Sequence, residues 1–160
     1  MNSLEISNIL TSDKFVSPIY GGTLASDELP SAIEQYPCCF CVNTAPKHDI
    51  GEHWIALFLP RKDCLEVFCS MGTGPKIHAI SRHFKLFYKR FGSKRISSNK
   101  RCLQDILSSC CGLYTIAYLQ TKCRGYPLKT FISCFSLNSK LNDEILRKVY
   151  KVKRIDVTNS

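Results

Sequence analysis

The chain has 160 residues, of which 44% are hydrophobic and 22% are charged, and its formal net charge is +9. This balance is typical of a globular protein, and the length suffices to bury a core without disulfides or metal, so we predict one domain over residues 1–160. No apolar run reaches the roughly 20 residues that cross a bilayer, and no secretory signal is visible at the N-terminus. These features argue against a membrane partner and predict an intracellular protein, which we expect to be a monomer.

The excess of 22 basic over 13 acidic residues has two interpretations. It favours non-specific binding to nucleic acid through phosphate contacts. It is equally compatible with a solvated basic surface that binds nothing specific, because the basic residues are spread over 85–101 and 147–154. Both interpretations remain open at this stage.

The first half of the chain reads as strands joined by short connections. The expected elements are a short helix in the first dozen residues, a turn at 19–22, a one-turn helix at 26–30, strands at 38–43, 53–59 and 64–69, and a turn at 60–63. The three strands follow one another closely, which predicts an antiparallel meander.

Helices dominate the second half. Helical spacing of apolar residues predicts helices at 75–91 and 111–122, a helix striped by Leu128, Phe131, Ile132 and Phe135, and a last helix striped by Ile145, Leu146 and Val149, with a short strand at 95–98. The segment 111–122 is apolar nearly all round, so we expect its helix to be central and buried. Strands first and helices later make the fold class α+β.

Ten cysteines would suggest disulfides in a secreted protein, but nothing else in the sequence indicates secretion. Cys38 and Cys41 form a CxxC spacing. No second CxxC or Cys/His pair follows at zinc-finger distance, so we predict no metal site and interpret these cysteines as buried strand residues.

Two segments carry residues suited to nucleophilic catalysis, 51–58 and 104–114. Cys111 opens the buried helix, where backbone N–H groups favour a thiolate, and Gly112 beside it leaves room for a substrate backbone. His53 stands at the mouth of an apolar strand, where it could act as a base, and Gln104 could donate into an oxyanion hole. Taken singly, each of these residues is equally compatible with a structural role.

The combination resembles the adenain-like cysteine peptidases, the maturation proteases of adenoviruses and of Polinton (Maverick) elements, whose wider clan includes the SUMO-deconjugating proteases. The matching stretches are 22–30, 37–44, 51–54, 68–72, 99–104, 108–114 and 142–143, in family order. The seven-residue step from Gln104 to Cys111 and the Cys111-Gly112 pair are the most specific of these matches.

The resemblance implies a thiol endopeptidase that cleaves capsid or core precursors after small residues such as glycine. It makes Cys111 the nucleophile, His53 the general base and later acid, Gln104 the oxyanion donor, and Trp54 a wall beside the base. It also implies a location in the host nucleus or the virion, no required cofactor, and possible activation by DNA or by a short peptide.

One position departs from the family pattern. The family places an acid after the phenylalanine of the third strand to orient the histidine, and Cys69 stands there in this chain. Strand alternation should point Glu66 to the other face. A thiol is a weak hydrogen-bond acceptor, so three outcomes are open: a working Cys–His dyad, help from another residue, or a slow or inactive enzyme. The alternatives are therefore a non-catalytic protein that binds DNA or capsid proteins, and a deconjugase of ubiquitin-like modifiers.

Overall fold

The computed structural model describes residues 1–51 and 53–151, so Glu52 of the 51–54 motif and the basic residues beyond 151 lie outside the described residues. The helices and strands are α1 (Ser3–Ser12), β1 (Tyr20–Leu24), β2 (Cys38–Asn43), β3 (Trp54–Arg61), β4 (Cys64–Phe68), α2 (Pro75–His78), α3 (Arg82–Phe91), β5 (Arg95–Ser98), α4 (Cys111–Cys123), α5 (Leu128–Ser133) and α6 (Ser139–Val149). Two 3₁₀ turns, η1 (Ser17–Ile19) and η2 (Ser26–Glu28), flank β1.

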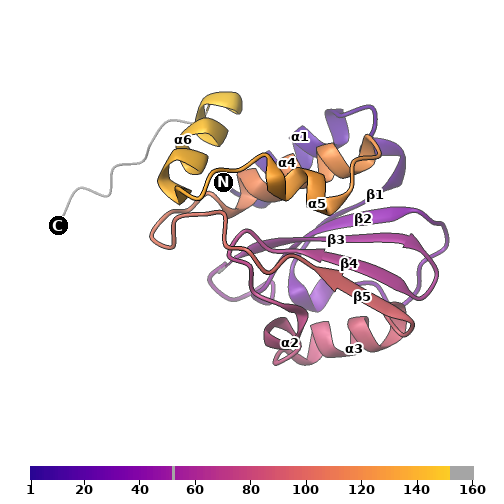
Figure 1. Cartoon of the computed structure of the whole chain (residues 1–160). Coiled ribbons are helices and arrows are strands. Elements are labelled where there is room, and N and C mark those ends of the chain that lie inside the picture. The colour runs from indigo at the N-terminus through magenta and orange to yellow at the C-terminus, as the bar shows by residue number, and fades with distance from the viewer. Residues whose placement is uncertain (52, 152–160) are drawn as a thin grey trace.

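The strands form one five-stranded sheet in the order β1-β2-β3-β4-β5. The three central strands pair antiparallel, as predicted, and the edge strands β1 and β5 pair parallel with their neighbours. Figure 1 shows α1, α4, α5 and α6 on one face of the sheet and α2 and α3 on the other. The protein is therefore a mixed α+β fold with helices on both faces, in agreement with the predicted class.

The predicted turn at 19–22 is wrong, because this segment enters the sheet as β1. Gly21 is required by close packing, since a β-carbon there would lie 2.0 Å from the ring of Phe40. The pairing register shifts between Tyr20 and Gly22, and Gly22 has a positive φ of 132°. Glycines in this strand thus permit a bulge and a close approach, and they do not mark a chain reversal.

The predicted helix at 75–91 is two helices. Ser81 has an extended backbone (φ −66°, ψ 129°) and precedes the first turn of α3. Ile77 and Ile80 were expected on a buried stripe, but they are 58% and 82% exposed. The apolar spacing continues across the break, which is why sequence periodicity joined the two helices.

Two further boundaries differ from expectation. Strand β3 runs on through Pro60 to Arg61, so the turn contracts to two residues, of which Asp63 has a left-handed φ of 63°. On α6 only Leu146 of the predicted stripe is buried, whereas Ile145 and Val149 are 48% and 64% exposed. The face of α6 that packs inward is instead partly polar, with buried Asn142 and Asp143.

A separate apolar core covers each face of the sheet. Helix α4 is central to the first, as predicted, and its Tyr114, Ile116, Tyr118 and Leu119 are fully buried. Cys38 and Cys41 are buried in β2 and belong to opposite cores, so the CxxC spacing divides them between two faces. None of the helices in the described part of the chain is long and apolar enough to cross a membrane.

Candidate active site

The start of β3 lies against the first turns of α4. A β-carbon at position 112 would lie 3.5 Å from Cδ1 of Trp54, an ordinary van der Waals distance, so the indole lies against the first turn of α4. One turn later the Thr115 hydroxyl donates to the Trp54 carbonyl at 3.2 Å. Cys111 is the first residue of α4 and is half-buried, whereas Cys110 is buried. The structure thus brings the 53–54 and 111–112 segments, which are far apart in sequence, to one place.

His53 contacts the residue that stands at the acid position. Its Nε2 lies 3.2 Å from Sγ of Cys69, at the end of β4. Burial lowers the pKa of His53, so the imidazole is neutral at physiological pH. Burial raises the pKa of Cys69, and the backbone N–H groups of Met71 and Thr73 oppose that rise. With Nε2 engaged in this way, Nδ1 is the nitrogen available for other chemistry.

Cys69 sits in a backbone segment that is clamped by Asn99. The Asn99 Oδ1 accepts from the Cys69 N–H at 3.0 Å, and its Nδ2 donates to the Cys69 carbonyl at 2.6 Å. Gly72 has a left-handed φ of 69°, and a β-carbon there would lie 2.7 Å from the Lys100 carbonyl oxygen. The 69–72 and 99–104 segments can therefore pack backbone to backbone only with glycine at position 72.

Gln104 belongs to the two packed segments 69–72 and 99–104, which we call the platform, and it is 3% exposed. Its Oε1 accepts from the Ser70 hydroxyl at 2.7 Å, and its Nε2 donates to the Ser108 carbonyl at 2.7 Å. Both contacts fix the direction of the carboxamide. An amide nitrogen carries two N–H donors, so the Nε2 of Gln104 has one more than its contact with Ser108 uses.

A polar cluster on α4 and α6 secures the chain just before Gln104. The carbonyl of Leu103 accepts from Asn142 Nδ2 at 3.0 Å, and the Tyr114 hydroxyl lies 3.0 Å from the same oxygen. That hydroxyl donates to Asp143 Oδ1 at 2.7 Å. The Asn142-Asp143 pair, which matched the family pattern in sequence, thus holds the loop that carries Gln104.

Glu66 cannot replace the missing acid. It faces α4, where it accepts from the Tyr118 hydroxyl and pairs with Lys122 Nζ at 2.7 Å. Cys69 belongs to the core on the other face of the sheet. The sequence-based expectation that strand alternation separates these two residues agrees with this arrangement.

A cavity of about 450 Å³ opens beside His53, between the sheet and α2. The side chains of Met71, Ile77 and Phe84 make it largely apolar, and His78 lies close enough to His53 for the two rings to repel when charged. Burial and this repulsion lower the pKa of His78 to about 4. The cavity therefore stays uncharged near neutral pH and suits an apolar side chain.

The structure places the predicted site residues in neighbouring pairs, whose assembly into one site stays a prediction. His53, Cys69 and Trp54 approach from the sheet, and Gly112 from α4 beside Cys111. Gln104 enters through the Ser70 contact on the same platform as Cys69. The sequence indicates no role for Asn99, Ser70 or Gly72. Asn99 and Gly72 act through backbone contacts, and the Ser70 hydroxyl donates to the distant Gln104, so no spacing rule reveals them.

No protein-family model matches the chain, and no curated protein matches it either. Several solved structures are similar. One is the crystal structure of the selenomethionine ASFV pS273R protease (TM-score 0.39, 24% identity, 69% of this chain and 44% of that chain). Another is the central domain of an uncharacterized Lpg1148 protein from Legionella pneumophila (TM-score 0.48, 14% identity, 94% of this chain and 93% of that domain). The chain spans less than half the length of the ASFV protease.

Proposed function

We propose that this protein is a cysteine endopeptidase, with Cys111 as nucleophile, His53 as base and Gln104 as oxyanion donor. The observation that carries the proposal is the contact of His53 Nε2 with Cys69 Sγ at 3.2 Å, beside a helix start that carries Cys111. A Cys–His peptidase needs one imidazole nitrogen held by a partner and the other directed at the thiol. Cys69 occupies the place of that partner.

The proposed reaction is acyl transfer. The Cys111 thiol gives its proton to Nδ1 of His53 and forms a C–S bond with the scissile carbonyl carbon. The oxyanion then accepts hydrogen bonds from Gln104 Nε2 and from the backbone N–H of Cys111. Collapse breaks the C–N bond, and the departing amine takes the proton from His53. Water, deprotonated by His53, then cleaves the thioester and restores the thiol.

The proposed substrates are protein precursors cut after small residues such as glycine. This preference comes from the family resemblance, and Gly112 adds nothing to it, because a β-carbon at position 112 would face Ile6, Met1 and Trp54. From the family resemblance we further propose maturation of capsid or core precursors in the host nucleus or virion, with the +9 charge serving non-specific DNA contacts. DNA or a short peptide is proposed as an activator and no cofactor is required.

Selective alkylation tests the proposal. Iodoacetamide should modify Cys111 faster than the other nine cysteines at neutral pH, because a base-paired thiol carries more thiolate. His53→Ala should remove this selectivity, and Cys110→Ala should preserve it. Peptide mapping by mass spectrometry measures the rate at each site. Equal and slow modification of all cysteines, in wild type and His53→Ala alike, would contradict the proposal.

The second candidate is a non-catalytic protein of the same fold that binds DNA or capsid proteins. The observation that favours it is the thiol of Cys69, which can also donate a hydrogen bond to Nε2 of His53. The imidazole proton would then lie on Nδ1, and Nδ1 could not accept the proton of Cys111. This candidate predicts the uniform slow alkylation described above. A deconjugase would instead show selective alkylation together with cleavage after the Gly-Gly tail of a folded modifier.

A further inference from the structure

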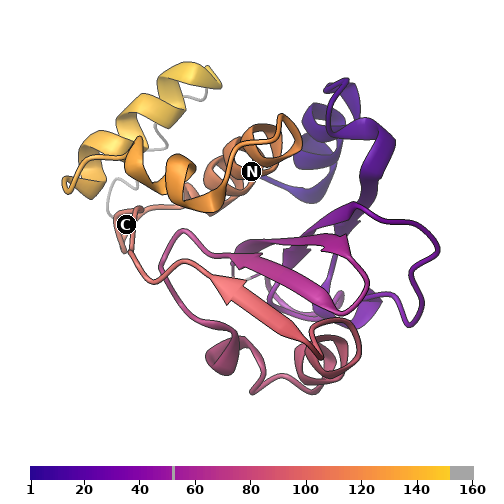
Figure 2. The same cartoon turned by 45° about the vertical axis from the view of Figure 1, so that its right-hand side comes forward.

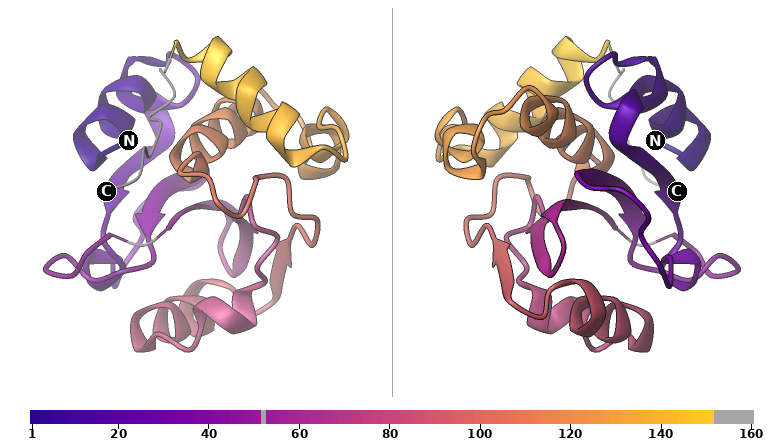
Figure 3. Two further views of the ribbon diagram at one scale, coloured as in Figure 1. Left: turned by 90° about the vertical axis from the view of Figure 1, so that its left-hand side faces the viewer. Right: turned by 90° about the vertical axis from the view of Figure 1, so that its right-hand side faces the viewer.

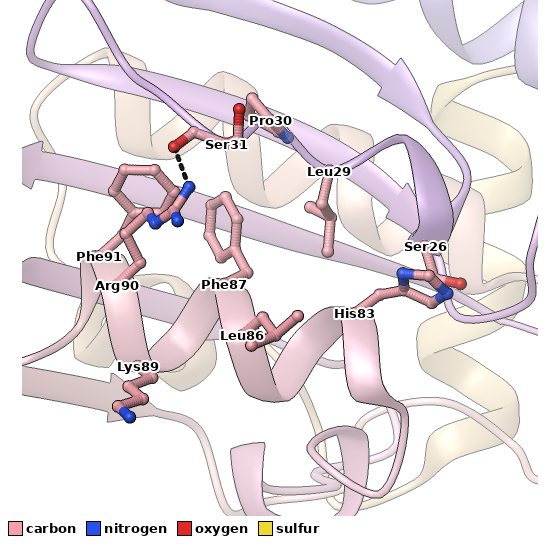
Figure 4. A pocket seen from close by; sticks show the side chains of 10 residues that line it. All are labelled: Ser26, Leu29, Pro30, Ser31, His83, Leu86, Phe87, Lys89, Arg90 and Phe91. Atoms are coloured by element: carbon pink, nitrogen blue, oxygen red, sulfur yellow. Dashed lines mark hydrogen bonds between the residues drawn. The ribbon is translucent and has the colours of Figure 1, made fainter.

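A second cavity, of about 560 Å³, lies between α3 and the segment that follows β1. Figure 4 shows Leu29 on one side and Leu86 and Phe87 on the other, with their apolar side chains directed into the space between the two elements. Leu86 is 56% exposed although it lines the cavity. This volume is in the range of sites that hold a ligand or a few peptide side chains.

Arg90 gives the rim of this cavity a positive charge. His83 and Arg90 lie on the side of α3 that faces residues 26–31, and Arg90 donates to the Ser31 carbonyl. That contact uses one of the five donors of the guanidinium. None of the described residues that line the cavity is acidic. The positive rim above an apolar floor suits a ligand that combines apolar and anionic groups.

The nearest carboxylates are engaged away from this rim. Asp27 accepts from the Lys47 N–H at 2.8 Å, and Glu28 pairs with Lys47 Nζ at 2.6 Å. In contrast, the floor contains a polar group without a partner: the Ser26 hydroxyl is fully buried, and no described residue hydrogen-bonds to it. Neither carboxylate of η2 forms an ion pair with Arg90 among the described residues.

This cavity adjoins the one beside His53. Ser81 and Phe84 line the cavity beside His53. His83 and Phe87, which follow them along the chain by one turn or less, line the second cavity. On the opposite wall, Thr44 lines the first cavity, and the next residue, Ala45, accepts a backbone hydrogen bond from Ser26 at 3.1 Å. A chain that occupied the cavity beside His53 could therefore continue along α3 into the second one.

We propose that the cavity between α3 and residues 26–31 binds an acidic and apolar segment of the protein substrate, distant from the cut bond. This inference rests on the proposed peptidase function. The same positive charge would attract duplex DNA, but the phosphate backbone has no apolar group that could pack against the leucine and phenylalanine side chains of the cavity. Recognition of a distant segment adds binding energy that the small residues next to the cut cannot supply.

The test uses the full chain carrying Cys111→Ala, so that binding is measured without turnover. The probe is a short fluorescein-labelled peptide that alternates glutamate and leucine, followed by fluorescence anisotropy. Arg90→Glu should weaken binding about tenfold through charge reversal. Leu86→Ser should weaken it severalfold without changing the charge. Lys85→Glu is the matched control, because Lys85 is exposed on α3 but does not line the cavity, and it should have little effect.

Three results would overturn the inference. The first is equal weakening by Lys85→Glu and Arg90→Glu, which indicates a general charge effect. The second is tight binding of a matched lysine–leucine peptide. The third is displacement of the probe by a short DNA duplex whose own binding is insensitive to Leu86→Ser, which assigns the face to nucleic acid.

A cleavage assay separates this inference from the proposed function. In the active protein, adding the glutamate–leucine segment to a glycine-containing peptide should raise kcat/KM about tenfold at the best spacing, and Arg90→Glu should remove that gain. Cleavage with no gain at any spacing would overturn the inference and leave the peptidase intact. Selective peptide binding without cleavage of any substrate would overturn the peptidase and, with it, the role of this segment as substrate.

Discussion

The two faces of the sheet are covered in different ways. On one face, α1, α4, α5 and α6 close over a continuous core, and the polar groups within it are paired, as in the contact of Tyr114 with Asp143. On the other face α2, α3 and the segment with Leu29, Ile33 and Tyr36 cover the sheet, and cavities open at either side of α3. Figure 2 and both views of Figure 3 show the same unequal coverage.

This difference indicates that the two faces have different roles. Two of the three residues proposed to react are fixed from the closed face, where α4 positions Cys111 and the cluster around Leu103 secures Gln104, whereas His53 contacts Cys69 of the open-face core. Substrate recognition is proposed for the open face, where apolar cavities and a cationic helix leave room for a peptide. Positions on the closed side should therefore change the rate of reaction, and positions on the open side should change binding.

The largest effect is expected for Gln104→Ala on the closed side. An oxyanion donor acts on charge that forms only in the transition state, so kcat should fall about 100-fold or more with little change in KM. Steady-state hydrolysis of a glycine-containing fluorogenic peptide measures both constants. An increase in KM with no change in kcat would contradict the role of Gln104.

Ser70→Ala is the control for this prediction. It removes the 2.7 Å hydrogen bond to Gln104 Oε1 but leaves the donor nitrogen in place. The loss in kcat should therefore be smaller than that of Gln104→Ala. An equal loss would mean that the platform as a whole is disturbed, and Gln104 would then have only a structural role.

The platform also shows how far a sequence can predict a site. The side chains of Cys111, His53 and Gln104 suit nucleophilic catalysis, but their roles come from the family resemblance and stay predictions. The sequence does not indicate Asn99 and Gly72, because their roles depend on two loops that meet at carbonyl and N–H groups. Such backbone contacts leave no periodic signal. The exposed Ile77 of α2 and Ile80 just after it mislead for a related reason: apolar spacing does not distinguish a core from the wall of an open cavity.

Gly72→Ala should give the next largest effect. Position 72 has a left-handed φ, and an added methyl group would lie 2.7 Å from the Lys100 carbonyl oxygen. We expect a loss of about 3 kcal/mol in the free energy of unfolding, from backbone strain and displacement of the 99–104 segment. Urea denaturation followed by tryptophan fluorescence measures it, since Trp54 is the single tryptophan.

The neighbouring Gly74 provides the matched control. Its φ is −78°, and no atom lies within 4 Å of an added β-carbon. Gly74→Ala should therefore leave the free energy of unfolding nearly unchanged. If both substitutions destabilise equally, the loop 70–74 simply requires flexibility, and the close approach of the two segments is not what selects glycine at position 72.

The smallest effect concerns the departure at position 69, where Cys69 of the open-face core contacts His53. Burial holds the pKa of His53 below its ordinary value of about 6.5, so the imidazole is neutral, and able to act as a base, down to that lowered pKa. The acid limb of kcat/KM should therefore lie below about pH 6.5. A carboxylate in place of the Cys69 thiol would stabilise the imidazolium and raise the pKa of His53.

Cys69→Asp should accordingly move the acid limb to higher pH and raise kcat/KM on the plateau about tenfold, because a carboxylate accepts from Nε2 and never donates to it. Cys69→Asn, which has nearly the same shape without the charge, should leave the limb where it is in wild type. Thermal unfolding of both variants checks that the buried site tolerates the change. A shift of the limb that is the same in both variants, or no shift in either, would mean that residue 69 does not act on the imidazole, and the 3.2 Å contact would be packing alone.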